Sequence, residues 1–258
     1  MPMSTPPAAN SIVGTIEVQT NQTKRFRKIG FALWLLLWPL VLAAWWFPIK
    51  FASLRLLIIV GVFALCSGAL VLFWKAKTVR FAALVIFATI ALLLLLPGRE
   101  YSRAALRNQY VACLQNYDGA PYLWGGESAR GIDCSGLVRR GMMDATLQTG
   151  IKTFNTQMIR ASFDLWWHDA SAQAMMEEYR GNTRVLFAAK SLNELDYAKL
   201  LPGDFAVTSS GVHTLAYIGN QTWIEADPGP MRVIQVRVPT RNAWFSMPMK
   251  IVRWRELE

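Results

Sequence analysis

Residues 125–138 read GGESARGIDCSGLV, and this stretch decides the fold of the C-terminal part of the chain. It carries Cys134, one of three cysteines in 258 residues, directly after a glycine-rich loop. The residues from Leu137 to Leu147 favour a helix that starts at Asp133 or Cys134. A cysteine at a helix N-terminus feels the positive end of the helix dipole, which stabilises its thiolate. The pattern therefore predicts a nucleophilic cysteine.

A cysteine nucleophile needs a base, and the whole chain contains two histidines. His213 lies in SGVHTLAYIG, a predicted strand and hence a rigid platform. His168 lies in DLWWHDA, a predicted helix with large aromatic neighbours, where we expect it to pack or to face solvent. The sequence favours His213 as the base.

The elements around these residues predict an α+β domain. Residues 104–115, AALRNQYVACLQ, suit an amphipathic helix, and β-rich segments separated by turn residues recur from Asp204 to the C-terminus. Helices followed by an antiparallel meander define the α+β class.

Several blocks of this domain, taken in order, resemble the NlpC-type cell-wall cysteine peptidases, a papain-like family. The resemblance covers about residues 104–240 and rests on APYLWGGESARGIDCSGLV, then LPGDFAV, then VHTLAYIGNQTWIEA. The matching positions are Tyr122, Gly125, Gly126, Asp133, Cys134, Ser135, Gly136, Pro202, Gly203, Asp204 and His213.

The resemblance implies roles for individual residues. Cys134 would be the nucleophile and His213 the base. Glu225 stands where the family usually has His, Asn or Gln, and a carboxylate there can orient the imidazole and stabilise its charged form. Tyr122 matches a family tyrosine that contacts substrate or the oxyanion. The candidate substrate contacts are Tyr122, Asp133, Ser135 and Asp227.

Two further features depart from the family. Val212 stands where serine is common, so a substrate hydrogen bond is expected to be missing. The stretch between Cys134 and His213 is long, which predicts an inserted helical piece around residues 155–195.

The hairpin that follows His213 must satisfy a geometric condition, because side chains alternate along a strand. A two-residue turn at Gly219 and Asn220 would place His213 and Glu225 on opposite faces. A three-residue loop or a bulge places Leu215 opposite Glu225 and His213 opposite Asp227, all on one face. The catalytic interpretation requires the second arrangement, which also makes Asp227 a rival to Glu225 as the orienting acid.

The N-terminal part holds three uncharged apolar runs, at residues 29–47, 56–74 and 81–96. The first two have the length of a membrane-spanning helix, and the third needs a flanking residue or local thinning of the bilayer. Trp45, Trp46 and Trp74 stand at their borders, as interfacial anchors do. We therefore predict three transmembrane helices with membrane lipids as partners.

The net charge of +10 belongs mainly to this membrane region, where residues 1–97 hold nine Lys/Arg and one acid, Glu17. A nucleic-acid footprint should lie on the folded domain, so no nucleic-acid partner is expected. Seven of these basic residues precede the first run or separate the second from the third, and only Lys50 and Arg55 lie between the first and second. The positive-inside rule then places the N-terminus in the cytoplasm and the domain outside.

These features divide the chain into a disordered cytoplasmic tail with a basic flank (1–28), a three-helix membrane region (29–97) and a papain-like domain (98–258). The predicted location is the bacterial inner membrane, with the catalytic domain on the periplasmic or extracellular side. We expect Cys66 and Cys113 to be packing residues, and no metal site or cofactor.

Three functions fit this sequence. The leading hypothesis is a membrane-anchored peptidoglycan endopeptidase that cleaves stem-peptide amides through a thioester. The second is a membrane-proximal cysteine acyltransferase or hydrolase acting on a lipid-linked precursor. The third is a non-enzymatic membrane scaffold with a degenerate peptidase domain.

Overall fold

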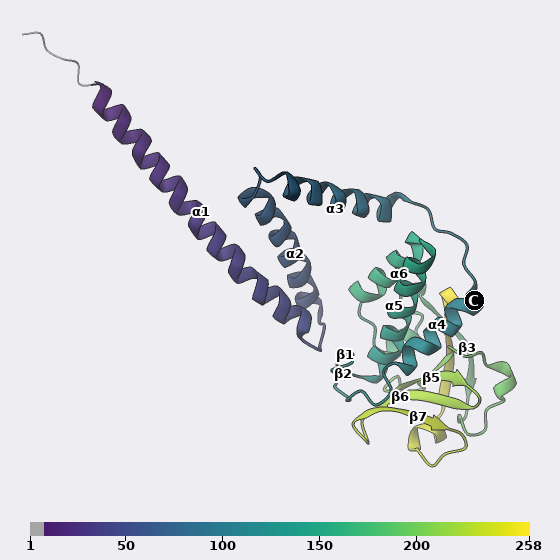
Figure 1. Ribbon diagram of the computed structural model, residues 1–258. Helices are drawn as coiled ribbons and strands as arrows, with labels where there is room; N and C mark the ends of the chain where they lie inside the picture. Colours follow the sequence, from purple (N-terminus) through teal and green to yellow (C-terminus); the bar gives the residue numbers. More distant parts are fainter. Residues whose placement is uncertain (1–7) are drawn as a thin grey trace, which may run out of the picture. The chain divides into compact units, whose positions relative to one another are not determined.

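The computed structural model describes residues 8–258, with side chains at residue 22 and from residue 25 onward (Figure 1). The chain forms two compact units. One runs up to Trp46 and continues over Leu56–Ala88, and the other combines Phe47–Arg55 with Thr89–Glu258.

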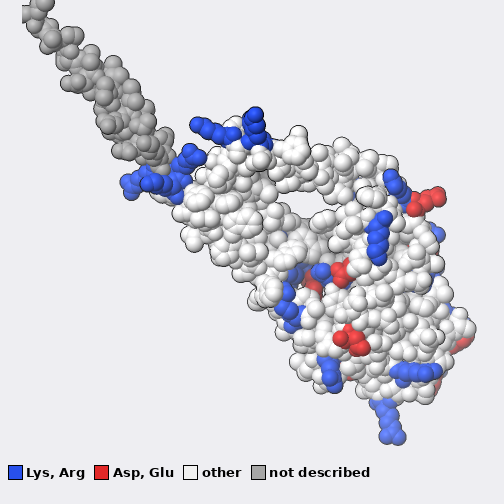
Figure 2. Space-filling model, in the orientation of Figure 1, with Lys and Arg blue, Asp and Glu red and all other residues white. Residues whose placement is uncertain are grey.

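The first unit is built from long apolar helices: α1 (Ala8–Trp46), α2 (Ala52–Leu72) and most of α3 (Lys77–Leu95). Three stretches are long and apolar enough to cross a membrane, Arg25–Trp46, Ala52–Leu72 and Lys77–Leu95. Their large apolar side chains are mostly exposed. Figure 2 shows blue Lys and Arg side chains gathered near the α2–α3 junction and beside α1, with a white surface between. A protein surface of this kind suits lipid better than water.

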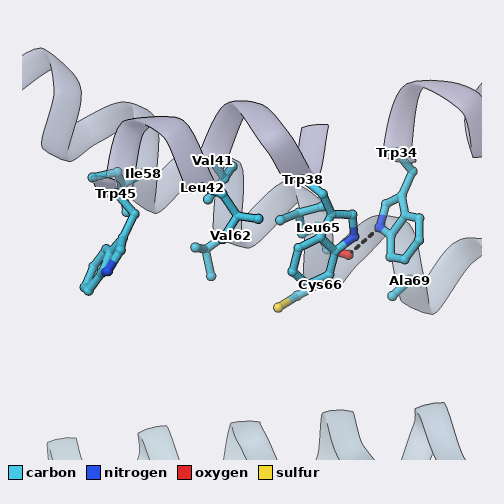
Figure 3. A pocket seen from close by; sticks show the side chains of 10 residues that line it. All are labelled: Trp34, Trp38, Val41, Leu42, Trp45, Ile58, Val62, Leu65, Cys66 and Ala69. Atoms are coloured by element: carbon cyan, nitrogen blue, oxygen red, sulfur yellow. Dashed lines mark hydrogen bonds between the residues drawn. The ribbon is translucent and has the colours of Figure 1, made fainter. Parts of the chain in front are cut away.

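Helices α1 and α2 pack closely through small residues. A Cβ on Gly61 would lie 2.5 Å from Val41, and one on Gly68 would lie 2.5 Å from Trp34. The indole Nε1 of Trp34 donates to the Leu65 carbonyl at 2.9 Å. Beside this contact is an apolar cavity of about 490 Å³, shown in Figure 3. Trp34, Trp38, Trp45 and Cys66 are among its lining residues, so Cys66 does lie in apolar surroundings.

The N-terminal tail differs from its sequence prediction. Disorder was expected over residues 1–28, but α1 begins at Ala8; residues 1–7 lie outside the described part of the chain. No proline interrupts residues 8–28, and extending an existing helix adds one hydrogen bond per residue without a new nucleation step. The helix therefore continues backward from the first apolar run.

The second unit is the α+β domain that the sequence predicts. Its helices are α4 (Arg103–Gln115), α5 (Cys134–Thr153), α6 (Thr156–Trp167) and α7 (Ala172–Met176). A two-stranded sheet, β1 (Glu127–Ser128) and β2 (Gly131–Ile132), precedes α5. The six-stranded antiparallel sheet has the order β3-β8-β4-β5-β6-β7, from β3 (Thr183–Ala189), β4 (Phe205–Thr208), β5 (Thr214–Gly219), β6 (Thr222–Asp227), β7 (Arg232–Arg237) and β8 (Met249–Trp254).

Strand β3 corrects the prediction of a wholly helical insertion over residues 155–195. The first part is helical as expected, in α6 and α7, but Thr183–Ala189 pairs antiparallel with β8. An edge strand with mixed burial has a weak alternation pattern, so its pairing partner β8, 60 to 71 residues further along the chain, decides its structure.

The core covers both faces of the six-stranded sheet. On one face, helices α4 and α5 contribute Leu106, Tyr110, Leu137 and Met142, which pack with sheet residues such as Ile224. On the other face, Trp223, Phe245 and Met249 belong to a second cluster. This double packing fixes α5, and hence Cys134, against the sheet.

Candidate active site

Cys134 is the first residue of α5, and Asp133 caps that helix. The Asp133 carboxylate accepts the backbone N–H of Gly136 at 2.6 Å and the hydroxyl of Ser135 at 3.0 Å. Its other oxygen accepts the N–H of Gly125 at 2.7 Å. One carboxylate thus ties the glycine loop to the start of the helix. Asp133 and Ser135, predicted as substrate contacts, lie at the cleft but make these contacts with the protein itself.

The glycine loop packs on the helix start without spare room. A Cβ on Gly136 would lie 2.2 Å from the Gly126 carbonyl oxygen, and one on Gly126 would lie 2.3 Å from the Gly131 carbonyl oxygen. The Gly126 oxygen also accepts the N–H of Asp133 at 3.1 Å. These contacts explain why the motif carries glycine at both positions.

The β5–β6 hairpin fulfils the geometric condition through a bulge. Ala216 pairs with Ile224 and Tyr217 with Trp223, and the register then shifts so that Gly219 pairs with Thr222. Asn220 and Gln221 form the turn, both with positive φ. The bulge lies at Ile218, and the register beyond it is the one that the catalytic interpretation required.

His213 lies directly before β5 and is held by Thr208 of β4. Its N–H donates to the Thr208 hydroxyl at 3.1 Å, and its carbonyl accepts the Thr208 N–H at 3.0 Å. Its imidazole Nε2 lies 2.7 Å from Glu225 Oε2, and Cys134 is close enough to the ring to raise its pKa. Nδ1 is therefore the nitrogen available to the thiol, so the structure brings Cys134, His213 and Glu225 together.

This arrangement shifts the pKa values of His213 and Glu225. Burial lowers the pKa of His213, but its hydrogen bonds to Cys134 and Glu225 and their negative charges outweigh that effect and raise the pKa to about 9. Burial also raises the pKa of Glu225, and the bond from His213 opposes that rise. A charged imidazolium is favoured between two groups that can carry negative charge.

Glu225, and not Asp227, is the acid that is hydrogen-bonded to the His213 imidazole. The amide of Asn242 donates to both acids, to Glu225 Oε1 at 2.9 Å and to Asp227 Oδ2 at 3.1 Å. Trp244 stacks on the His213 ring, with centroids 4.2 Å apart, and its indole donates to Asp227 at 3.4 Å. The sequence analysis missed Asn242 and Trp244. Asn242 caps a short 3₁₀ helix (Ala243–Ser246) that contains Trp244, and no sequence motif marks this segment.

A cleft of about 680 Å³ opens beside Cys134 and His213. Charged and polar groups, Glu127, Arg139, Asp169 and Gln173, share its lining with Trp124. Tyr122 also lines it, and burial together with the negative charges of Cys134, Asp133 and Asp227 raises the pKa of this phenol to about 12. Val212, 59% exposed, stands at the wall where a serine was expected.

The remaining candidates lie elsewhere. His168 ends α6, where its Nδ1 contacts the Asp164 carbonyl. Cys113 is buried against Gln109 and Gln148, burial raises the pKa of its thiol, and it is unpaired with Cys134. Across residues 8–258, no cluster of three or more His, Cys, Asp or Glu side chains could hold a metal ion.

A cysteine at a helix N-terminus facing a histidine on an adjoining antiparallel sheet defines a papain-like α+β domain. A family model described as the NlpC/P60 family matches residues 119–253, which is more than half of the chain. The chain belongs to the NlpC/P60 family.

Solved structures give a weaker likeness. NlpC2 from Trichomonas vaginalis is 17% identical with a TM-score of 0.39, over 60% of this chain and 49% of that one. The peptidoglycan hydrolase RipB from Mycobacterium tuberculosis is 19% identical with a TM-score of 0.36, over 62% and 70%. The NlpC/p60 domain of the peptidoglycan hydrolase SagA is 22% identical with a TM-score of 0.34, over 58% and 98%. The match spans about half of the first of these structures, and no curated protein sequence matches the chain.

Proposed function

We propose that this protein is a membrane-anchored cysteine endopeptidase that cleaves amide bonds in peptidoglycan stem peptides. The observation that carries the proposal is the chain of contacts Cys134–His213–Glu225 beside a cleft of about 680 Å³. Membership of the NlpC/P60 family supports a cell-wall peptidase.

In the proposed mechanism His213 takes the proton of Cys134, and the sulfur attacks the substrate carbonyl carbon as the carbonyl electron pair moves to oxygen. Backbone N–H groups at the start of α5 stabilise that oxyanion. The C–N bond then breaks, and His213 protonates the leaving amine. Water attacks the thioester, passes a proton to His213 and releases the thiolate.

Glu225 acts on the ring rather than on the substrate. It accepts from Nε2 and thereby fixes the tautomer that leaves Nδ1 towards sulfur. Asn242 holds Glu225 in turn. Tyr122 remains the candidate contact to substrate or oxyanion, since its phenol lies at the cleft near Cys134. In this proposal, Asp133 and Ser135 act by fixing the conformation of the first turn of α5.

The membrane anchor is residues 29–97, and the catalytic domain begins after residue 97, on the periplasmic or extracellular side of the inner membrane. Three apolar helices and the basic residues that flank them support this topology.

Digestion of purified sacculi by the full-length protein in detergent tests the function. Mass spectrometry should find new amino and carboxyl termini within the stem peptides with wild type and none with Cys134→Ala. Equal digests from the two proteins would refute the peptidase activity.

A lipid-linked wall precursor is the second candidate substrate, because the domain is fastened to the end of the last apolar helix. The Thr156 hydroxyl donates to the Leu96 carbonyl at 2.9 Å, and Arg160 donates to the Leu93 and Leu96 carbonyls at 2.6 and 2.9 Å. These contacts tie α6 to the end of α3, next to the level where lipid-linked peptides would be attached. Faster cleavage of the lipid-linked peptide than of the same free peptide would favour this candidate.

A non-enzymatic scaffold remains the third hypothesis, motivated by Val212 and Glu225. The proximity of Cys134 to the His213 ring argues against it. A scaffold should show no enhanced reaction of Cys134 with a thiol reagent at neutral pH.

A further inference from the structure

Residues 47–55 comprise the connection between α1 and α2 and the first turn of α2, yet they form one compact unit with the C-terminal domain. The Glu127 N–H donates to the Pro48 carbonyl at 3.1 Å, and Ile49 pairs antiparallel with Gly126. The segment thus supplies backbone partners to the glycine loop that precedes Cys134.

Arg55 joins the same loop through a buried charge cluster. Its side chain is fully buried, and its Nη2 lies 2.6 Å from Glu127 Oε1. The same oxygen lies 2.6 Å from Nη1 of Arg139, which is on α5 five residues after Cys134. Glu127 is 6% exposed and Arg139 1%. Buried charges need partners with good geometry, so the three side chains fix one another.

Arg139 extends this cluster into the domain. Its guanidinium also contacts the Asp169 carboxylate and donates to the carbonyls of Leu165 at 2.8 Å and His168 at 3.1 Å. Glu127, Arg139 and Asp169 all line the cleft. The wall of the cleft is therefore built on a cluster that includes Arg55.

A displacement of Glu127 would also shift Cys134, because few contacts separate the two residues. Gly126, the preceding residue, accepts the Asp133 N–H at 3.1 Å and packs on Gly136 with no room for a Cβ. A shift of β1 therefore moves the first turn of α5, where the thiol and the oxyanion-binding N–H groups lie.

We propose that residues 47–55 complete the catalytic domain and that Arg55 is a positioning residue, which acts on Cys134 through Glu127. This inference deepens the proposed function and rests on it for the chemistry of Cys134. It also requires the α1–α2 connection and the domain to lie on one side of the membrane, as two crossings between them allow. A fragment that begins at residue 98 would lack the segment.

Alkylation of the full-length protein in detergent by iodoacetamide tests the inference without any assumed substrate. Mass spectrometry reads the rates at Cys134 and Cys113 separately across pH 6–9. Cys113 is 1% exposed and serves as an internal gauge of folding. The variants are Arg55→Gln, Arg55→Lys, Glu127→Gln and the double Arg55→Gln/Glu127→Gln. Arg99→Gln, an exposed arginine after α3, is the matched control.

We expect wild type and Arg99→Gln to alkylate Cys134 rapidly. Arg55→Gln and Glu127→Gln should each slow it at least tenfold and shift its pH profile, with Cys113 still protected. The double variant should be no slower than Glu127→Gln alone, because Arg55 acts through Glu127. Arg55→Lys should fall between wild type and Arg55→Gln.

An alkylation rate at Cys134 in Arg55→Gln within twofold of the wild-type rate would overturn the inference. So would equal gains in alkylation at Cys113 and Cys134, which would mean that Arg55 only stabilises the fold. If Arg55→Gln does not fold, Arg55→Lys decides: a rate equal to that of wild type refutes the positioning role. A wild type with no enhanced rate at Cys134 would instead contradict the proposed function.

Discussion

At the scale of the residue, the site depends on a buried imidazole held between a thiol and a carboxylate. Nε2 of His213 is committed to Glu225, and the ring is stacked on Trp244. Glu225 is itself held by Asn242. These contacts together restrict the imidazole ring of His213 to one orientation. The charge state of the ring then links activity and stability to pH.

Stability should fall as pH rises from 6.5 to about 9, through the His213 contribution. The pKa of His213 is raised from 6.5 to about 9 in the folded protein, because its bonds to Cys134 and Glu225 outweigh the effect of burial. Because the pKa of His213 is raised in the folded protein, its protonation stabilises the fold, and this contribution is complete below pH 6.5. The contribution is lost as the pH rises through the folded-state pKa of about 9. Thermal midpoints across this range should decline less in Glu225→Gln than in wild type. Parallel curves would contradict the linkage.

Asp133 offers a second test at this scale. Asp133→Ala removes the cap of α5 and the tie to Gly125, so the free energy of unfolding should fall by about 1–2 kcal/mol. Asp133→Asn keeps one oxygen acceptor and should lose less. Urea denaturation measures both; equal losses would show that the cap is not what Asp133 provides.

At the scale of the element, the glycine loop and helix α5 form one tightly packed unit. Gly126→Ala places a Cβ 2.3 Å from the Gly131 carbonyl oxygen, so the glycine loop before β1 must move away from β2. We expect at least a tenfold loss of peptide cleavage. Gly119→Ala is the control, because Gly119 has positive φ but nothing within 4 Å of the added Cβ. Equal losses of cleavage in the two variants would show that the collision at residue 126 is not the cause.

Much of this architecture could be predicted from local sequence signals. Asp133 before Cys134 marks a helix start, and the alternation around His213 and Glu225 required a bulge that Ile218 supplies. Strand β3, Asn242 and Trp244 could not be predicted, since their positions depend on distant partners. Arg55 directly precedes the second apolar run, and only its tertiary contact with Glu127 indicates a role in the domain.

At the scale of the whole molecule, three apolar helices precede an NlpC/P60 domain. The second unit also takes in the connection between the first two helices. Under our proposal, the apolar region contributes residues to the catalytic domain in addition to anchoring it. The proposed topology places that connection and the domain on the outer side together.

Labelling with a membrane-impermeant thiol reagent tests this topology in bacterial spheroplasts. In a background with Cys66→Ala and Cys134→Ala, Arg99→Cys should be labelled in intact cells. Lys77→Cys should be labelled only after permeabilisation, because the α2–α3 connection is predicted to be cytoplasmic. The reverse pattern would invert the orientation.

The most direct test of the central claim is hydrolysis of purified muropeptides by the full-length protein in the presence of hydroxylamine. If Cys134 forms a thioester, hydroxylamine will compete with water, and mass spectrometry will detect a hydroxamate at the new carboxyl end with wild type and no product with Cys134→Ala. A free carboxylate alone, formed in equal amount by both proteins, would contradict covalent catalysis by Cys134.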